Sequence, residues 1–284
     1  NNRPVDYSQY RQKQKRLALY FDRIRRPSGK RVQVSIDDLI ADLQAKAEHM
    51  ALWIGRREWL AQGFFNGYYD NKGLRVDGKS SGSLQMLLPS QVFAIMSGIA
   101  SSEQVRKTYA SIKKHLYDRR LGGIRLNTDR GSVAMDFGRA FGFSYGDKEN
   151  GAFFSHMNVM LAYALFKSGF SREGGEVLRS IYDMARGPQA AMPAVLPEYF
   201  NGQGKGLYLY LTGSASWFIH TLLGEVLGVH YRFGDLVLEP QLLSDDFFGR
   251  EIRVTLGAEG GFLRLVFVKG AGVSGRRACV IKKV

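Results

Sequence analysis

The sequence predicts a mainly α-helical chain that ends in a β region. Over much of residues 36–228, apolar residues recur at the three- to four-residue spacing of one helix face. From residue 229 the apolar runs are short, rich in β-branched residues and separated by glycines, which is the pattern of strands. Helices followed by strands indicate two folding units, a helical domain and a small β-sandwich or an appended sheet.

Residues 1–35 form a polar, basic N-terminal segment. Its basic side chains include Arg11, Lys13, Lys15, Arg16, Arg23, Arg25, Arg26 and Lys30. The segment lacks the apolar centre of a secretion signal, and no apolar run in the chain reaches the roughly 18 residues of a membrane helix. We therefore expect a cytoplasmic protein without a membrane partner.

Six helices separated by long loops are predicted after this segment, as in antiparallel helical hairpins. The longest covers residues 36–61, and Ser35 with Asp38 approximates an N-terminal capping box. The stretch "FFNGYYDNKGLRVDG" at 64–78 is aromatic and rich in Gly, Asn and Asp, which predicts a loop with at most short strands. The other helical patterns cover residues 89–99, 102–116, 150–168, 171–186 and 212–228.

Four runs in the C-terminal region predict strands. They read "GDLVLEPQL", "REIRVTLGA", "GFLRLVFVKG" and "RRACVIKKV". Partial alternation of apolar and polar residues supports this interpretation. The chain has a single cysteine, Cys279, so no internal disulfide is expected, which fits a reducing compartment.

Three predicted loops are long enough to carry function. The stretches 64–88, 117–149 and 187–211 exceed the about 12–15 residues that an ordinary connection needs. All three are rich in residues that bind sugars, namely Trp, Tyr, Phe, Asn, Asp, Gln and Arg. The alternative is that the aromatic residues only pack the loops against the core.

The formal net charge of +14 favours an anionic partner. Nucleic acid is disfavoured, because the basic residues are spread along the chain and accompany no known nucleic-acid-binding motif. An anionic substrate would be steered by the same field.

The stretch "YLYLTGSASWF" at 208–218 predicts an anion site. Thr212, Gly213 and Ser214 stand where an apolar helix begins. The first turn of a helix carries unpaired N–H groups and a partial positive charge, and both attract anions. A simple N-terminal cap is the alternative.

Three motifs occur in a characteristic order: "ENGAFFSH" at 149–156, "LTGSASW" at 211–217 and the "LGV…GDLVLEP" exit at 227–240. Together they resemble the C-terminal half of the inverting glycoside phosphorylases of glycoside hydrolase family 94, which include cellobiose, chitobiose and 1,2-β-oligoglucan phosphorylases. The resemblance extends over about residues 36–270, and the long loops are most similar to the oligoglucan branch.

The resemblance implies a ring of helical hairpins, the (α/α)6 toroid, with residues 36–228 as part of it and a β-sandwich over residues 229–284. It implies phosphate-dependent, inverting cleavage of a β-glucoside or β-glucan oligosaccharide, giving α-glucose 1-phosphate. One carboxylic acid then protonates the leaving oxygen, and phosphate replaces the base and its water. No metal or cofactor is implied, since inorganic phosphate enters as a substrate.

The resemblance also assigns roles to residues. His156, Thr212 and Gly213 match phosphate-binding positions, and Glu149 matches an acidic residue that holds sugar hydroxyls at the cleaved bond. A core histidine, a plain helix cap and a surface pairing of Glu149 with Lys148 are the respective alternatives.

Other candidates for binding the sugar lie in the long loops. Gln203 matches a family glutamine that contacts the same sugar, with Glu198 as a competitor. Composition and loop position add candidates for holding the acceptor glycan, namely Arg125, Asn127, Asp129 and Arg139.

The family's general acid has no match in this sequence. It is an aspartate in a "GDWND"-like segment upstream of the helix at residue 36, and Asp6 lacks that context. Asp129 or Asp136 would replace it only if buried, because burial raises the pKa of a carboxyl group. Six helices are also half of a closed ring, which leaves apolar faces open to water.

We therefore expect an N-terminal portion or a partner chain to complete the toroid, and a homodimer stays open. Two alternatives to phosphorolysis remain. One is a non-catalytic carbohydrate-binding module or subunit that lacks the acid. The other is ordinary hydrolysis, which needs a second carboxylate as base.

Overall fold

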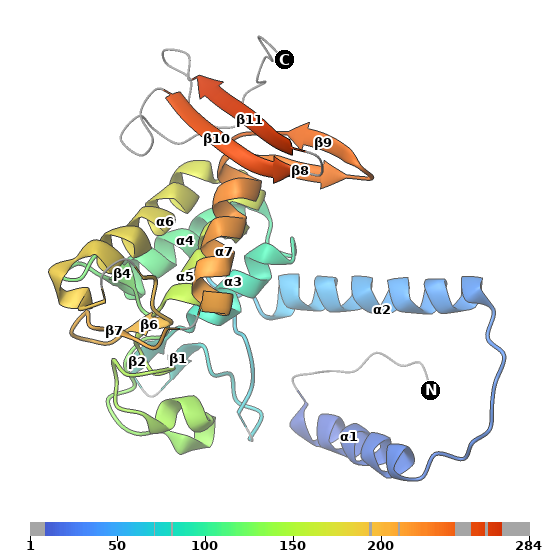
Figure 1. The fold of residues 1–284 in the computed structure, drawn as a ribbon. Helices are drawn as coiled ribbons and strands as arrows, with labels where there is room; N and C mark the ends of the chain where they lie inside the picture. The colour runs from blue at the N-terminus through green and yellow to red at the C-terminus, as the bar shows by residue number, and fades with distance from the viewer. Residues whose placement is uncertain are drawn as a thin grey trace.

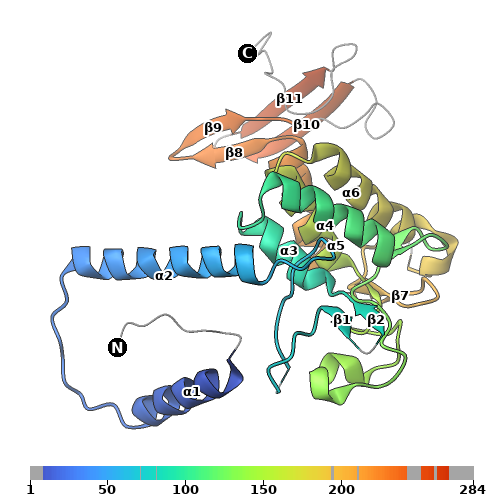
Figure 2. The same ribbon diagram turned by 180° about the vertical axis from the view of Figure 1, so that it is seen from behind.

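The computed structural model describes residues 9–70, 72–80, 82–192, 195–209, 211–241, 251–258 and 261–268. Helix α2 (Ile36–Arg57) extends away from a helical body that carries two β-hairpins at another end, and α1 (Tyr10–Arg25) lies below α2 (Figure 1, Figure 2). The expectations about Asp6, Cys279 and the strand "RRACVIKKV" lie outside the described residues.

Helix α2 confirms the long helix predicted from residue 36, but it ends at Arg57 instead of residue 61. The next residues pair with the loop, because Trp59 forms a bridge with Phe65 and the Leu60 amide donates to the Phe64 carbonyl at 2.9 Å. These bonds end the helix.

The capping box predicted for α2 is wrong. Ser35 occupies the N-cap position, yet its side chain makes no capping hydrogen bond. Ser35 and Asp38 are both exposed, so the start of this helix is open to solvent.

Helix α1 was not predicted, because charged residues interrupt its apolar pattern. Its apolar residues Leu17, Phe21 and Ile24 nevertheless recur at a helical spacing.

Five helices form the body and confirm the helical class. Helix α5 is central, since it packs against α3, α6, α7 and the two π-helical turns that flank α7. The bounds are α3 Leu88–Met96, α4 Ser102–His115, α5 Ser155–Lys167, α6 Ser171–Arg186 and α7 Ser216–His220, with the π-helical turns η4 Leu211–Ala215 and η5 Thr221–Val226. The helix predicted over 212–228 is therefore present as the continuous segment η4–α7–η5, although its π-helical geometry was not predicted.

The helix predicted to begin at residue 150 begins at Ser155. The preceding strand β5 (Phe153–Phe154) pairs with β6 (Tyr199–Phe200), which pairs with β7 (Gly206–Leu207). Because these residues bond to a distant strand, they are not free to enter the helix.

The remaining short elements lie in the long loops. They are the paired strands β1 Gly78–Ser80 and β2 Ser83–Gln85, the paired strands β3 Tyr117–Asp118 and β4 Gly123–Ile124, and the 3-10 turns η1 Met135–Phe137, η2 Arg139–Gly142 and η3 Pro188–Ala190.

The described C-terminal residues form two antiparallel hairpins. Strands β8 (Val229–Arg232) and β9 (Asp235–Leu238) make the first, and β10 (Glu251–Ala258) and β11 (Gly261–Val268) make the second. Small antiparallel sheets after the helices confirm the predicted β region. The β-sandwich itself stays a prediction.

Several loop aromatics belong to the core. Phe64 and Phe200 are fully buried in the same hydrophobic cluster as Phe166 of α5. For these residues, packing accounts for the aromatic character of the loops.

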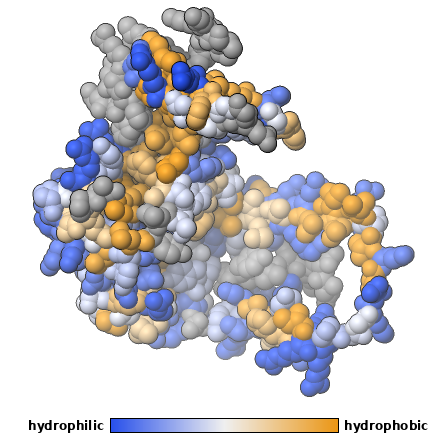
Figure 3. Space-filling model, in the orientation of Figure 1, coloured by the Kyte–Doolittle hydropathy of each residue, from blue (hydrophilic) through white to orange (hydrophobic). Residues whose placement is uncertain are grey.

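The N-terminal helices leave apolar side chains in water. Ile36 is 71% exposed and Leu43 is 56% exposed, and hydrophobic surface follows α2 and part of α1 (Figure 3). An open apolar face was expected from a half ring of helices. Among the described residues, no helix has both the length and the apolar composition needed to cross a membrane.

Candidate functional site

A large cavity lies between α2, α3, the N-terminal end of α5 and the long loops. Its volume is about 950 Å³. Aliphatic and aromatic side chains dominate its lining, and a few polar groups converge on it, as in ligand sites. Its aromatic members are Trp53, Phe65, Tyr68, Tyr69, Phe93, Phe141 and Phe154, and its carboxamide and carboxyl members are Glu58, Asn66, Asn127 and Glu149.

Glu149 offers an unpaired carboxylate oxygen at this cavity. Its Oε2 atom is buried, and no described residue hydrogen-bonds it. Its Oε1 atom lies 3.6 Å from Nη1 of Arg139, while the Lys148 ammonium lies 4.8 Å from the centre of the Phe143 ring. In the structure, the ion pair of Glu149 is thus with Arg139, and not with Lys148 as in the alternative interpretation. A buried acceptor without a donor is a site for a ligand hydroxyl.

His156 stands in the first turn of α5 with an unpaired ring nitrogen. Its Nε2 atom is buried and has no partner among the described residues. Burial lowers the pKa of His156, so the imidazole is neutral at pH 7. The neighbouring residues Phe154 and Met157 line the cavity.

The structure brings the two predicted anion-binding motifs together. Helix α5 packs against η4, which carries Thr212 and Gly213, and against α7. The His156 ring lies 6.0 Å from the ring of Trp217, the second residue of α7. Thr212 is exposed and Gly213 is buried, so one hydroxyl of this turn is open to a ligand. The π-helical form of η4 is common at functional sites.

The other sequence candidates are dispersed. Arg125 is held inside the loop, because it pairs with Asp118 at 2.6 Å and donates to the Gly151 carbonyl at 2.8 Å. Burial raises the pKa of Asp118, but hydrogen bonds from Arg125 and from backbone amides outweigh it and lower the pKa. Asn127 is buried at the cavity, where it donates to Asn150 at 2.9 Å.

Gln203 and Glu198 lie near β6 and outside the lining of the cavity. Gln203 is exposed, and its backbone amide donates a hydrogen bond to Oδ1 of Asn201 at 3.0 Å. Glu198 is half-buried, and its carbonyl accepts from the Ser155 amide at 2.9 Å, which ties it to the start of α5. Their roles in sugar binding stay predictions.

Asp129 and Asp136 are both exposed. Asp129 accepts a hydrogen bond from the Gly131 amide at 2.8 Å. Neither carboxyl is therefore shielded from water in the way that a general acid in a closed site would be.

Two buried carboxyl groups beside the cavity were missed by sequence reasoning. Glu58 is 6% exposed and accepts hydrogen bonds from Trp53, Asn66 and Tyr69. An acidic residue directly before the aromatic loop, in "REWL", was the available signal.

Asp77 is 3% exposed and ties the same loop to α3. It accepts from the amides of Leu87 at 2.6 Å and Gly67 at 2.9 Å, and from the Ser90 hydroxyl at 3.1 Å. Burial raises its pKa to about 6, although these hydrogen bonds act in the opposite direction. Gly67 has no room for a side chain, since an added Cβ would lie 1.9 Å from the Ser90 hydroxyl oxygen.

Comparison with known proteins identifies relatives of the helical region. The family model "Glycosyl hydrolase 94 superfamily, catalytic domain" matches residues 35–228. Cellobionic acid phosphorylase of Neurospora crassa is 26% identical over 219 residues, which cover 72% of this chain and 26% of that protein. N,N'-diacetylchitobiose phosphorylase of Vibrio proteolyticus is 28% identical over 194 residues, covering 61% and 23%.

A third relative is 3-O-beta-D-glucopyranosyl-beta-D-glucuronide phosphorylase of Paenibacillus borealis. It is 26% identical over 216 residues, which cover 72% of this chain and 27% of the relative. The chain therefore spans about a quarter of the length of the curated relatives that it matches.

Proposed function

The chain belongs to the glycosyl hydrolase 94 superfamily, and from this membership we propose that it forms part of the catalytic domain of an inverting phosphorylase. Its substrates are a β-glucoside or β-glucan oligosaccharide and inorganic phosphate, and its product is α-glucose 1-phosphate. The three relatives above are all named phosphorylases, which supports this reaction class.

The proposal depends on the unpaired Nε2 atom of His156, which stands on the helix that packs against the turn carrying Thr212 and Gly213. A neutral imidazole in its Nε2–H tautomer donates to a phosphate oxygen. The exposed Thr212 hydroxyl is a second donor, and Gly213 lets the ion approach the backbone. Hydrogen bonds to a charged partner contribute about 1.5–3 kcal/mol each.

Glu149 holds the sugar in this proposal. Its unpaired Oε2 atom accepts a hydrogen bond from a sugar hydroxyl, and Arg139 orients the carboxylate through the other oxygen. Aromatic walls such as Trp53 and Phe154 pack against the apolar faces of the sugar rings.

In the reaction, a phosphate oxygen forms a bond to the anomeric carbon while the glycosidic bond breaks. The leaving oxygen takes a proton from a carboxylic acid. Because Asp129 and Asp136 are exposed, we assign the acid to the N-terminal portion or partner chain that completes the toroid. The open apolar faces of α1 and α2 support such a completion.

The test uses the completed protein and measures release of α-glucose 1-phosphate from β-glucan oligosaccharides. We expect His156→Ala and Thr212→Val each to lower kcat/KM for phosphate by about ten- to a hundredfold, as the loss of one charge-assisted hydrogen bond would. His220→Ala is the matched control, because His220 contacts the same Trp217 ring but is exposed.

Unchanged phosphate dependence in a His156→Ala, Thr212→Val double variant would reject the phosphate site. Cleavage that proceeds equally well without phosphate would identify a hydrolase instead.

A non-catalytic carbohydrate-binding chain is the second candidate, and the exposure of Asp129 and Asp136 favours it. One assay of the completed protein distinguishes the two functions. Binding of β-glucan oligosaccharides without release of sugar phosphate would select the second.

A further inference from the structure

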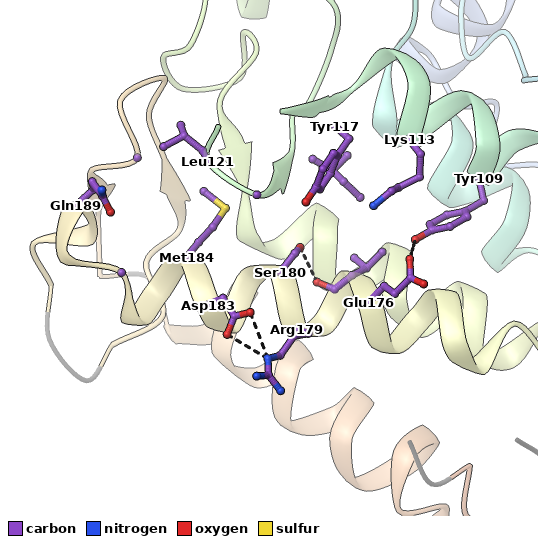
Figure 4. Close-up of a pocket in the computed structure, with 15 residues that line it drawn as sticks. Tyr109, Lys113, Tyr117, Leu121, Glu176, Arg179, Ser180, Asp183, Met184 and Gln189 are labelled. Carbon is purple, nitrogen blue, oxygen red and sulfur yellow. Dashed lines mark hydrogen bonds and ion pairs between the residues drawn. The ribbon is translucent and has the colours of Figure 1, made fainter. Parts of the chain in front are cut away.

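A second cleft lies between α4 and α6, apart from the candidate site. Its volume is about 490 Å³, and it shares no lining residue with the larger cavity. Figure 4 shows the residues that line it. The volume falls within the range of small-molecule sites. We call this cleft the α4–α6 groove.

Helix α6 presents a row of polar side chains along one wall of the groove. Glu176, Ser180 and Asp183 follow one another at spacings of four and three residues, so they share one helix face. The Tyr109 hydroxyl donates to Oε2 of Glu176 at 2.9 Å, and Nε of Arg179 donates to Asp183 at 3.1 Å. These bonds orient both carboxylates without using all of their acceptor positions.

The opposite wall is aromatic. It carries Tyr109 from α4 and Tyr117 from β3, and the Lys113 ammonium lies 3.8 Å from the centre of the Tyr117 ring (Figure 4). Gly122, Gly187 and Gly204 also line the groove and bring backbone instead of side chains to it.

The charges of the groove balance. Lys113 and Arg179 offset Glu176 and Asp183, whereas the whole chain carries a formal charge of +14. A phosphate or a nucleic acid would gain little in such a neutral cleft. A neutral ligand with many hydroxyl groups fits, because each hydroxyl both donates and accepts hydrogen bonds and the rings offer apolar faces.

We propose that the α4–α6 groove is a second glycan-binding site, which takes a neutral β-linked gluco-oligosaccharide outside the catalytic cavity. The choice of a β-glucan rests on the proposed function. A second contact with the same polymer keeps its ends near the cavity by raising their effective concentration.

The test is a titration of the ¹⁵N-labelled chain with cellotetraose and with sophorotetraose, followed through backbone amide signals. We expect saturable shifts in residues 109–122 and 176–189. Tyr117→Ala should weaken this binding by about tenfold, as removal of an aromatic anchor does. Glu176→Gln keeps the shape of the wall and an oxygen that accepts from Tyr109, but it removes the negative charge. This variant should also weaken the binding.

Matched controls lie nearby. Lys114→Ala changes an exposed lysine next to Lys113, and Tyr182→Ala changes an exposed tyrosine of α6, and neither residue lines the groove. Both should bind normally. A Glu149→Gln variant should lose shifts around the larger cavity and keep those in the groove, which separates this proposal from the proposed function.

Absence of groove shifts with both sugars overturns the proposal. So do groove shifts that are unchanged in both Tyr117→Ala and Glu176→Gln.

Discussion

At the scale of single residues, the cavity is built by polar groups whose partners are distant in sequence. Asp77 bonds to the Gly67 amide and to Leu87 and Ser90, so one carboxyl joins the aromatic loop to the start of α3. Since Tyr68 and Gly67 line the cavity, this carboxyl sets the position of part of its wall.

The raised pKa of Asp77 predicts a pH-dependent stability. A carboxyl with a folded-state pKa of about 6 stabilises the fold fully below the unfolded pKa, near 4, and loses that contribution as the pH rises to about 6. We expect the free energy of unfolding to fall by roughly 2–3 kcal/mol over this window because of Asp77. Chemical denaturation at a series of pH values measures it.

The matched variant is Asp77→Asn. It should be less stable at every pH, because its NH2 group faces an amide donor, and its stability should vary less between pH 4 and pH 6. An identical slope in both proteins would show that another group titrates.

Sequence reasoning found some of these residues and missed others for a physical reason. Glu149 and His156 stand in a motif that can be read locally, and both prove to have an unpaired buried atom. The burial of Glu58 and Asp77 arises from contacts with residues up to 13 positions away, which no local pattern encodes. A local sequence pattern also could not show that Arg125 forms an ion pair with Asp118 and donates a hydrogen bond to the Gly151 carbonyl.

At the scale of elements, periodicity predicted the helices because each buries one face. Helix α6 has the predicted bounds, 171–186. The start of α5 was wrong because β5 pairs with β6, some 45 residues later in the sequence. The π-helical turns on either side of α7 could not be predicted from the sequence. A π-helical turn changes the backbone hydrogen bonds from i→i+4 to i→i+5, and no residue composition marks that change.

The N-terminal ends of α4 and α2 allow a paired prediction about the effect of helix capping on stability. Ser101 accepts from the Gln104 amide at 3.3 Å and the Gln104 side chain bonds back, so α4 has a complete capping box. Ser35 holds the same position on α2 without such a bond. We expect Ser101→Ala to cost about 1 kcal/mol of unfolding free energy and Ser35→Ala much less, as measured by denaturation. Equal costs would contradict this assignment of the caps.

At the scale of the whole molecule, the family prediction from three motifs is confirmed by the match over residues 35–228. The expected open face is also present. Ile36, Leu39 and Leu43 share one side of α2 and are all exposed, while the C-terminal end of the helix reaches the cavity at Met50 and Ile54. One stripe therefore continues from the site into solvent.

This stripe predicts where the completing segment that we propose would bind. In the chain alone, a Leu39→Ser, Leu43→Ser variant should have nearly normal stability, because both side chains already lie in water. When the N-terminal portion or partner chain is present, the same variant should associate more weakly, since burying one leucine contributes about 1.5–3 kcal/mol. Glu48→Ser, on another side of α2, is the control. Sedimentation or titration calorimetry of the two components measures the association. Equal affinity of the stripe variant and the control would place the completing segment on another surface, and the general acid would then have to reach the cavity from a side that α2 does not border.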